Sequence, residues 1–321
     1  MARVLITGAS GFVGGHLARA CVQAGDEVIG VSRSGRIAPG CGEGMAVDLR
    51  DEAAALALVG DVRPELVYHL AVLSSVGRSW EAPGATMRDN VATAVNVLEA
   101  LRSRAPGARV VWVSSGEVYG VPERLPADEA LPVRPANPYA VSKTTGDLLA
   151  GVYADAHGLD LVRARPFNQA GPGQLPIFVV SWLARQAAEA LVAEAGSVRL
   201  VTGNPDTRRD FTDVRDVVRA HRLLAASGAR GIYNVACGRS VSVADHIRLI
   251  AELVAPLQVE HVVDPARLRA HEVMDLHGSH ARLTEATGWE PEIPLRQTIA
   301  DTIAWWEAEL ARPAPLGGVR H

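Results

Sequence analysis

Two side chains four residues apart in the segment NPYAVSK are the first candidates for acid–base chemistry. Tyr139 and Lys143 would lie on one face of a helix, because residues four apart are neighbours there. An ammonium group next to a phenol favours the phenolate and lowers the phenol pKa, so Tyr139 is expected to act as an acid or base near neutral pH. The apolar run RVVWVSS ends in Ser114 and Ser115, where a hydroxyl could polarise a carbonyl group.

A glycine-rich turn near the N-terminus predicts a site for a dinucleotide. In TGASGFVG, Gly8, Gly11 and Gly14 follow a strand-like run and open a helix. Glycine permits the turn and lets backbone N–H groups approach a pyrophosphate, whose charge a helix N-terminus favours. The spacing is GxxGxxG rather than GxGxxG, and the strand–turn–helix setting favours cofactor binding over an ordinary turn.

The end of the second strand-like run, EVIGVSR, bears on which dinucleotide binds. Proteins that bind NAD commonly place an acidic residue there for the ribose hydroxyl, but this chain has Ser32 and Arg33. A guanidinium can clamp the 2′-phosphate of NADP(H), which a carboxylate would repel, so NADP(H) is expected. If Arg33 is only a solvated loop residue, NAD(H) stays open. Asp48 is expected either to reach the adenine amino group or to cap the following helix.

The order of apolar and helical segments predicts how these residues are brought together. Helices are expected over residues 11–24, 86–105 and 137–158. The apolar runs between helical segments are continuous in Val and Ile rather than alternating, as in parallel strands covered on both faces. The pattern predicts an α/β fold with a doubly wound parallel (Rossmann) sheet and a smaller C-terminal α/β substrate lobe. His157 and His221 sit on helical patterns and are expected at the surface.

The composition argues against several classes of function. With 32 Lys and Arg against 36 Asp and Glu, the formal net charge is −4, so no overall basic field favours nucleic acid. Cys21, Cys41 and Cys237 are odd in number and far apart, which fits a reducing compartment, and no cluster has the spacing of a metal site. Neither a secretory signal nor an apolar run of membrane-spanning length is found. A soluble cytoplasmic protein is therefore expected.

Taken together, the motifs resemble those of the extended short-chain dehydrogenases/reductases that act on nucleotide sugars. The resemblance covers nearly the whole chain, from TGASGFVG through YHLA, SSGEVYG, YAVSK and RPFN to RDFTDVRD and GWEP. It implies that Ser115, Tyr139 and Lys143 form the catalytic group, and that Lys143 also holds the nicotinamide ribose. The expected cofactor-binding residues are Gly8, Ser10, Gly11, Phe12, Val13, Gly14, Ser32, Arg33, Asp48, Leu49, Leu70, Ala71, Val113, Tyr139, Lys143 and Pro166.

The residues that follow Ser115 help to separate the reactions of this family. Its 4,6-dehydratases resemble TDE or TSE where this chain has Ser115, Gly116 and Glu117. Elimination of water needs an acid or relay and a base beyond the tyrosine. Gly116 has no side chain to serve, whereas Glu117 remains a candidate catalytic and substrate-binding group. Reduction of a 4-keto sugar needs only a hydride, a proton from Tyr139 and a hydrogen bond from Ser115.

Two longer strings indicate a branch of the family. RPFNQAGPGQ and RRDFTDVRDVVRA resemble the branch that reduces GDP-4-keto-6-deoxy-mannose to GDP-rhamnose. The expected function is therefore NADPH-dependent reduction of such a 4-keto-6-deoxy sugar. The main alternative is an NAD-dependent nucleotide-sugar 4-epimerase, which must hold NAD through both half-reactions. A 4,6-dehydratase and a catalytically silent NADP-binding sensor are further alternatives.

The resemblance also implies which residues meet the substrate. Asn168 is expected at the diphosphate, and Arg209 at the diphosphate or ribose, where a fork-shaped donor suits two anionic oxygens. Arg269 and Glu272 in LRAHEV fall where the family often has RPxEV, with an arginine for phosphate and a glutamate for ribose hydroxyls; Ala270 replaces the usual proline. The alternative for Arg209 is a solvated ion-pair cluster.

The sequence also predicts how the chain is divided into domains and how it assembles. Residues 1–167 are expected to form the dinucleotide-binding domain, to which later segments return. Residues 168–312 are expected to bind mainly the nucleotide sugar, and residues 313–321 to form a flexible tail. The helices expected over 86–105 and 137–158 resemble those that pair across the dimer of the family, so a homodimer is expected.

Overall fold

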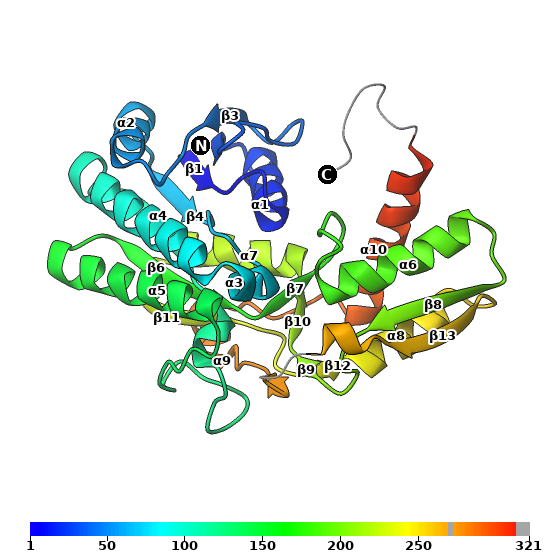
Figure 1. Ribbon diagram of the computed structural model, residues 1–321. Coiled ribbons are helices and arrows are strands. Elements are labelled where there is room, and N and C mark those ends of the chain that lie inside the picture. Colours follow the sequence, from blue (N-terminus) through cyan, green and yellow to red (C-terminus); the bar gives the residue numbers. More distant parts are fainter. Residues whose placement is uncertain (269–271, 313–321) are drawn as a thin grey trace.

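A parallel sheet lies at the centre of the protein, as shown by a computed structural model that describes residues 1–268 and 272–312 (Figure 1). Its seven strands run in the order β11–β6–β5–β4–β1–β2–β3, and every neighbouring pair is parallel. The strands are β1 (Arg3–Thr7), β2 (Glu27–Ser32), β3 (Glu43–Ala46), β4 (Leu66–His69), β5 (Arg109–Val113), β6 (Leu161–Pro166) and β11 (Gly231–Val235). The strand order reverses at β1, so the predicted doubly wound sheet is confirmed.

Helices cover both faces of this sheet, which explains why its strands are apolar throughout. Val4 and Ile6 of β1 pack on one helical layer, and Leu5 between them packs on the other. The first layer consists of α1 (Phe12–Gln23), α7 (Val214–Ala226) and α9 (Ala281–Thr287), and the second of α2 (Glu52–Val62), α4 (Pro83–Arg104) and α5 (Pro138–His157). α1, α4 and α5 lie within a few residues of the three helices predicted from sequence.

A smaller part, drawn mostly on the right of Figure 1, contains three short sheets and its own core. β8 pairs with β13, β7 with β10, and β9 with both β12 and β14. These strands are β7 (Asn168–Ala170), β8 (Ser197–Thr202), β9 (Arg208–Arg209), β10 (Phe211–Asp213), β12 (Val241–Ser242), β13 (Gln258–Val263) and β14 (Asp275–Leu276). The helices are α6 (Val179–Val192), α8 (Val243–Leu253) and α10 (Leu295–Ala311). The expected smaller C-terminal α/β part is thus confirmed.

Three short helices lie near the junction of the two parts: α3 (Val76–Glu81), η1 (Gly116–Tyr119) and η2 (Pro265–Arg267). Capping side chains determine where η1 and α5 begin. Asn137 caps α5, because its side chain accepts a hydrogen bond from the Ala140 amide at 2.8 Å, and Pro138 occupies the first turn. Ser115 caps η1 in the same way through the Glu117 amide at 3.2 Å. These caps place Tyr139 in the first turn of α5, next to Ser115.

One expectation about the surface is wrong. His221 is fully buried on α7, because α7 packs against the large sheet on that side, whereas His157 is exposed as expected. Arg269 and the expected tail, residues 313–321, lie outside the described residues. Within the described ranges, none of the helices has the length and apolar character needed to cross a membrane.

Candidate active site

A cleft of about 690 Å³ runs along the carboxyl ends of the large sheet. Its walls include residues at the ends of β1, β2, β4, β5 and β6 and residues of β7, α6 and β9 from the smaller part. Open parallel sheets bind their ligands at this edge. Every site residue predicted from sequence lines the cleft except Arg269, which lies outside the described ranges.

The glycine loop forms part of the cleft wall, and its positions 8 and 14 leave no room for a side chain. Gly8 has a φ of +74°, and a Cβ there would lie 2.9 Å from the Ala71 nitrogen. A Cβ on Gly14 would lie 2.3 Å from the Gly8 carbonyl oxygen. Gly11, the N-cap of α1, has no side chain to cap the helix, so the first N–H groups of α1 are available to an anion. The loop therefore fits the pyrophosphate of a dinucleotide.

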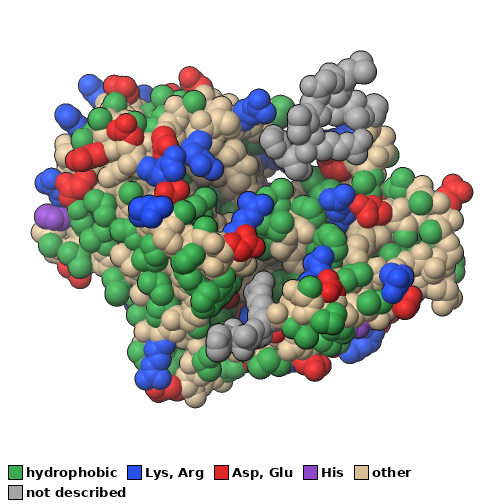
Figure 2. All heavy atoms as spheres, in the orientation of Figure 1, with side chains coloured by type: hydrophobic (Ala, Val, Ile, Leu, Met, Phe, Trp, Pro, Cys, Tyr) green, Lys and Arg blue, Asp and Glu red, His purple; other side chains and the backbone are tan. Residues whose placement is uncertain are grey.

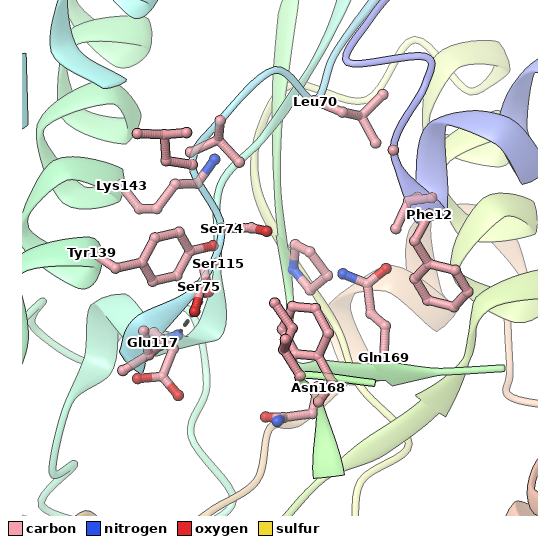
Figure 3. Close-up of a pocket in the computed structure, with 18 of the residues that line it drawn as sticks. Phe12, Leu70, Ser74, Ser75, Ser115, Glu117, Tyr139, Lys143, Asn168 and Gln169 are labelled. Atoms are coloured by element: carbon pink, nitrogen blue, oxygen red, sulfur yellow. Dashed lines mark hydrogen bonds between the residues drawn. The ribbon is translucent and has the colours of Figure 1, made fainter. Parts of the chain in front are cut away.

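Ser115, Tyr139 and Lys143 meet on one wall of the cleft (Figure 3). Their exposed fractions are only 7, 8 and 9%. The Tyr139 hydroxyl is directed toward Ser115, and Lys143 Nζ donates a hydrogen bond to the Val113 carbonyl oxygen at 2.5 Å. A phenol, a hydroxyl and an ammonium group are thus held together at the end of β5, as the sequence predicted. They can orient a carbonyl oxygen and give it a proton.

Burial controls the proton affinity of this group. It raises the pKa of Tyr139 to about 12, although the hydrogen bond with Ser115 acts in the opposite direction. It lowers the pKa of Lys143 to about 8. The expectation of a lowered phenol pKa is therefore wrong, because desolvation of the phenol is the largest influence on its pKa and Lys143 donates its hydrogen bond to the Val113 carbonyl oxygen instead. Tyr139 is protonated at neutral pH, as a proton donor must be.

The opposite end of the cleft is exposed and rich in charge. Asp48 accepts hydrogen bonds from Arg50 Nε at 2.9 Å and Nη2 at 2.6 Å, and Arg50 Nη1 also contacts Asp89 at 3.0 Å. The Arg50 hydrogen bonds hold the pKa of Asp48 at about 2. Asp51, rather than Asp48, caps α2 through the Ala54 amide, so the capping alternative for Asp48 is wrong. Asp48 and the exposed Arg33 both line the cleft here.

A further group of polar side chains in the cleft comes from η1 and the smaller part. Glu117 Oε2 accepts a hydrogen bond from Asn137 Nδ2 at 3.0 Å. Arg208 forms ion pairs with side chains of the smaller part, whereas Arg209 reaches the wall of the cleft. Glu272 lines the same region. Carboxylate and guanidinium groups at this end can bind hydroxyl groups and phosphate oxygens, respectively.

Sequence reasoning missed two glutamines of the cleft. The Oε1 atoms of Gln169 and Gln174 are buried and have no hydrogen-bond partner among the described residues, while Gln174 Nε2 donates to the Gln169 carbonyl oxygen at 2.7 Å. Gln169 follows Asn168 in β7, and the two side chains diverge, with Gln169 on the side of Phe12 (Figure 3). Buried acceptors of this kind need a donor, so they fit a bound ligand. Their position shortly after Asn168 in RPFNQAGPGQ is the feature of the sequence that could have indicated them as site residues.

Comparison with known proteins places this geometry in a family. The family model described as GDP-mannose 4,6 dehydratase matches residues 5–302. The chain is 36% identical to GDP-6-deoxy-D-mannose reductase of Pseudomonas aeruginosa over 96% of this chain and 98% of that protein. It is 32% identical to UDP-glucose 4-epimerase of Mycolicibacterium smegmatis over 95% of this chain and 98% of that protein.

Solved structures give the same result. The structure of RMD from Pseudomonas aeruginosa complexed with NADPH superposes with a TM-score of 0.83 at 35% identity, covering 96% of this chain and all of that one (100%). The UDP-glucose 4-epimerase of Thermus thermophilus complexed with NAD has a TM-score of 0.84 at 31% identity, covering 94% and 98% of the two chains. The protein therefore belongs to the extended short-chain dehydrogenases/reductases that act on nucleotide sugars.

Proposed function

We propose that this enzyme uses NADPH to reduce the 4-keto group of a nucleotide-linked 4-keto-6-deoxy sugar, with GDP-4-keto-6-deoxy-mannose as substrate and GDP-rhamnose as product. The observation that carries the proposal is the meeting of a protonated Tyr139, Ser115 and Lys143 on one wall of the cleft, beside a position 116 that bears no side chain. The 36% identity to a GDP-6-deoxy-D-mannose reductase supports the choice of substrate.

Each side chain of this wall has a separate task in the proposed reduction. Ser115 donates a hydrogen bond to the ketone oxygen as negative charge develops there. Tyr139 gives that oxygen its proton, which the raised phenol pKa keeps in place at neutral pH. Lys143 holds the cofactor ribose from the next turn of α5. A reduced nicotinamide bound in the cleft would supply the hydride for C4 of the sugar.

The wall around Gly116 argues against dehydration. A Cβ at this position would meet the ring of Phe167 at 2.9 Å, so the space that a side chain needs is already filled. The acid or relay that a dehydratase requires has no place there. Reduction needs no such group, because Tyr139 and Ser115 act on the ketone oxygen alone. The arrangement therefore favours a reductase, although the matching family model is named for a dehydratase.

The exposed end of the cleft supports NADPH over NADH. Ser32 and Arg33 line this end and no carboxylate follows β2 at that position, so Arg33 can meet a 2′-phosphate without repulsion. Asp48, held as a carboxylate by Arg50, can accept a hydrogen bond from the adenine amino group. We therefore assign NADP(H) as the cofactor.

Substrate binding and assembly follow from the other walls. We assign the sugar nucleotide to Asn168, Arg209, Glu117 and Glu272 of the cleft; Arg269 stays a prediction from sequence. Residues 1–167 would then bind mainly the cofactor and residues 168–312 mainly the substrate.

A homodimer is also part of the proposal. Hydrophobic side chains gather on the face formed by α4 and α5 (Figure 2), where Val141, Leu148 and Val152 of α5 are 38, 51 and 56% exposed. We propose that two copies of the chain pack these helices together, so that two helices of each copy meet at the interface. Light scattering at several concentrations tests this assembly.

A second candidate is an NAD-dependent 4-epimerase, which the identity of 31 to 32% to two UDP-glucose 4-epimerases favours. An epimerase would be purified with tightly held NAD and would convert a 4-hydroxy sugar without added NADPH. The test is to mix the enzyme with GDP-4-keto-6-deoxy-mannose and either NADPH or NADH, and to follow loss of the reduced cofactor. We expect consumption that is faster with NADPH and stops when the ketone is exhausted. Interconversion of 4-hydroxy sugars without added cofactor would contradict the proposal.

A further inference from the structure

An apolar patch of the cleft lies next to the proposed reaction centre. Phe167, Val273 and Leu276 all line the cleft and belong to one hydrophobic cluster beneath it. The ring of Phe167 lies against Gly116, the residue directly after Ser115. Leu276 of β14 pairs in register with Arg209 of β9, so the patch extends from the reaction centre toward the proposed phosphate-binding end.

The Phe167 ring is held rigidly in this patch. A Cβ on Gly116 would lie 2.9 Å from it, and a Cβ on Gly278 would lie 2.3 Å from it, so two glycines enclose the ring. Tyr119 stacks beside it with ring centroids 6.1 Å apart. Only 6% of Phe167 is exposed. A side chain clamped in this way is a fixed wall rather than an adaptable filler.

Other residues of the cleft near the reaction centre are polar. Glu117, which follows Gly116, accepts a hydrogen bond from Asn137 at 3.0 Å, and Ser74 and Ser75 also line the cleft. A sugar 4-ketone has two unlike neighbours, because C3 carries a hydroxyl and C5 carries C6. Hydroxyl groups bind well to the carboxylate and serine side. An apolar wall is complementary to a methyl group and offers a C6 hydroxyl no hydrogen bond.

We propose that the patch of Phe167, Val273 and Leu276 binds the C6 methyl group of the sugar, and that it makes the enzyme selective for 6-deoxy over 6-hydroxy nucleotide sugars. This inference rests on the proposed function, since it requires the ketone oxygen at Ser115 and Tyr139. It assigns Phe167 and Val273 a role in specificity, with no part in proton transfer.

Two sugar nucleotides that differ only at C6 provide the test. GDP-rhamnose and GDP-mannose are compared as substrates for oxidation by NADP⁺, and their binding to the enzyme with NADP⁺ is measured by calorimetry. The variants are Phe167→Leu, which opens the patch, and Val273→Thr, which places a hydroxyl in it at nearly constant volume. The matched control is Val192→Thr, on the exposed end of α6 and outside the cleft.

We expect the native enzyme to prefer GDP-rhamnose by at least about tenfold in kcat/KM, a typical size for one group in an apolar pocket. Phe167→Leu and Val273→Thr should each reduce the preference to about threefold or less, and Val192→Thr should leave it unchanged. No preference in the native enzyme, or an unchanged preference in both cleft variants, overturns the inference while the reductase proposal stands. Selective binding of GDP-rhamnose without any turnover would instead support the methyl site and contradict the reductase.

Discussion

The two ends of the cleft both hold ionisable side chains, but one end is exposed to solvent and the other is buried. At the proposed adenosine end, Arg50 and Asp48 are about two-fifths exposed, at 42 and 43% of their side-chain surface. At the reaction end, less than a tenth of Ser115, Tyr139 and Lys143 is exposed. Charges at the first end are screened by water and salt, so each of them contributes only a small free energy to ligand selectivity. At the second end desolvation dominates, so one proton or one atom has a large effect.

This contrast explains the pKa values along the cleft. Direct hydrogen bonds from Arg50 lower the pKa of Asp48 to about 2. Burial raises the pKa of Tyr139 to about 12 and lowers that of Lys143 to about 8. Hydrogen bonds from a cation therefore control the carboxylate at the exposed end, whereas desolvation is the largest influence on Tyr139 and Lys143. Changes at the buried end should have the larger effects.

The largest effect is expected from Tyr139→Phe. It removes the proton donor and keeps the ring, so turnover should fall by about 10²- to 10⁴-fold, the range of general acid catalysis. NADPH affinity should stay within about twofold, because the variant loses only a hydroxyl that serves the ketone. Initial rates and fluorescence titration with NADPH measure the two quantities. Ketone reduction by the variant at the parent rate would show that another group gives the proton.

Lys143 should give the buried end a pH-dependent stability. Its pKa is about 8 in the folded protein against an ordinary 10.5, so the folded state releases its proton first as the pH rises. Below pH 8 the buried charge is present and costs stability. Between pH 8 and 10 the free energy of unfolding of the native chain should rise, relative to Lys143→Met, by about 2 kcal/mol. Urea unfolding at several pH values measures this difference, and a pH-independent difference would mean that burial does not shift the lysine.

Arg33→Asp should produce a moderate change at the exposed end. The substituted carboxylate would repel the 2′-phosphate, so the ratio of NADPH to NADH affinity should fall by about tenfold, and by less at high salt. Arg36→Asp is the matched control, since it makes the same charge change at an exposed position that does not line the cleft. A ratio unaffected by Arg33→Asp, or changed equally by both variants, would rule out Arg33 as the phosphate clamp.

The smallest effect is expected from Arg50→Ala. This substitution breaks the ion pairs with Asp48 and Asp89, whose side chains are 43 and 26% exposed, so the urea midpoint should stay unchanged within error. NADPH binding should weaken slightly, because Asp48 loses the group that positions it. A large loss of stability would show that the two ends of the cleft differ less than their exposure indicates.

Local patterns made much of the cofactor side predictable. The turn has no room for side chains at Gly8 and Gly14, and these glycines lie close together in the sequence, where they can be recognised. Tyr139 and Lys143 are likewise joined by helical spacing alone. The substrate side was harder, because Phe167 is clamped between Gly116 and Gly278, which only the tertiary fold brings together. Nothing in the local sequence of Gly278 reveals this contact.

Burial was the other quantity that local patterns did not give. The sequence around His221 resembles the exposed face of a helix, but His221 is fully buried where α7 packs against the large sheet. The direction of the Tyr139 pKa shift was also predicted wrongly, because the neighbouring Lys143 was visible in the sequence and the desolvation of the phenol was not. The residue types of the site could therefore be predicted, and their electrostatics required the structure.

The most direct test of the proposed reaction follows a single hydrogen. NADPH carrying deuterium at the transferable position of nicotinamide C4 is incubated with the native enzyme and GDP-4-keto-6-deoxy-mannose, and the product is examined by NMR and mass spectrometry. We predict deuterium at C4 of the sugar, with NADPH oxidised in equal amount. A product without deuterium, or a change of configuration without net oxidation of NADPH, would contradict a reductase.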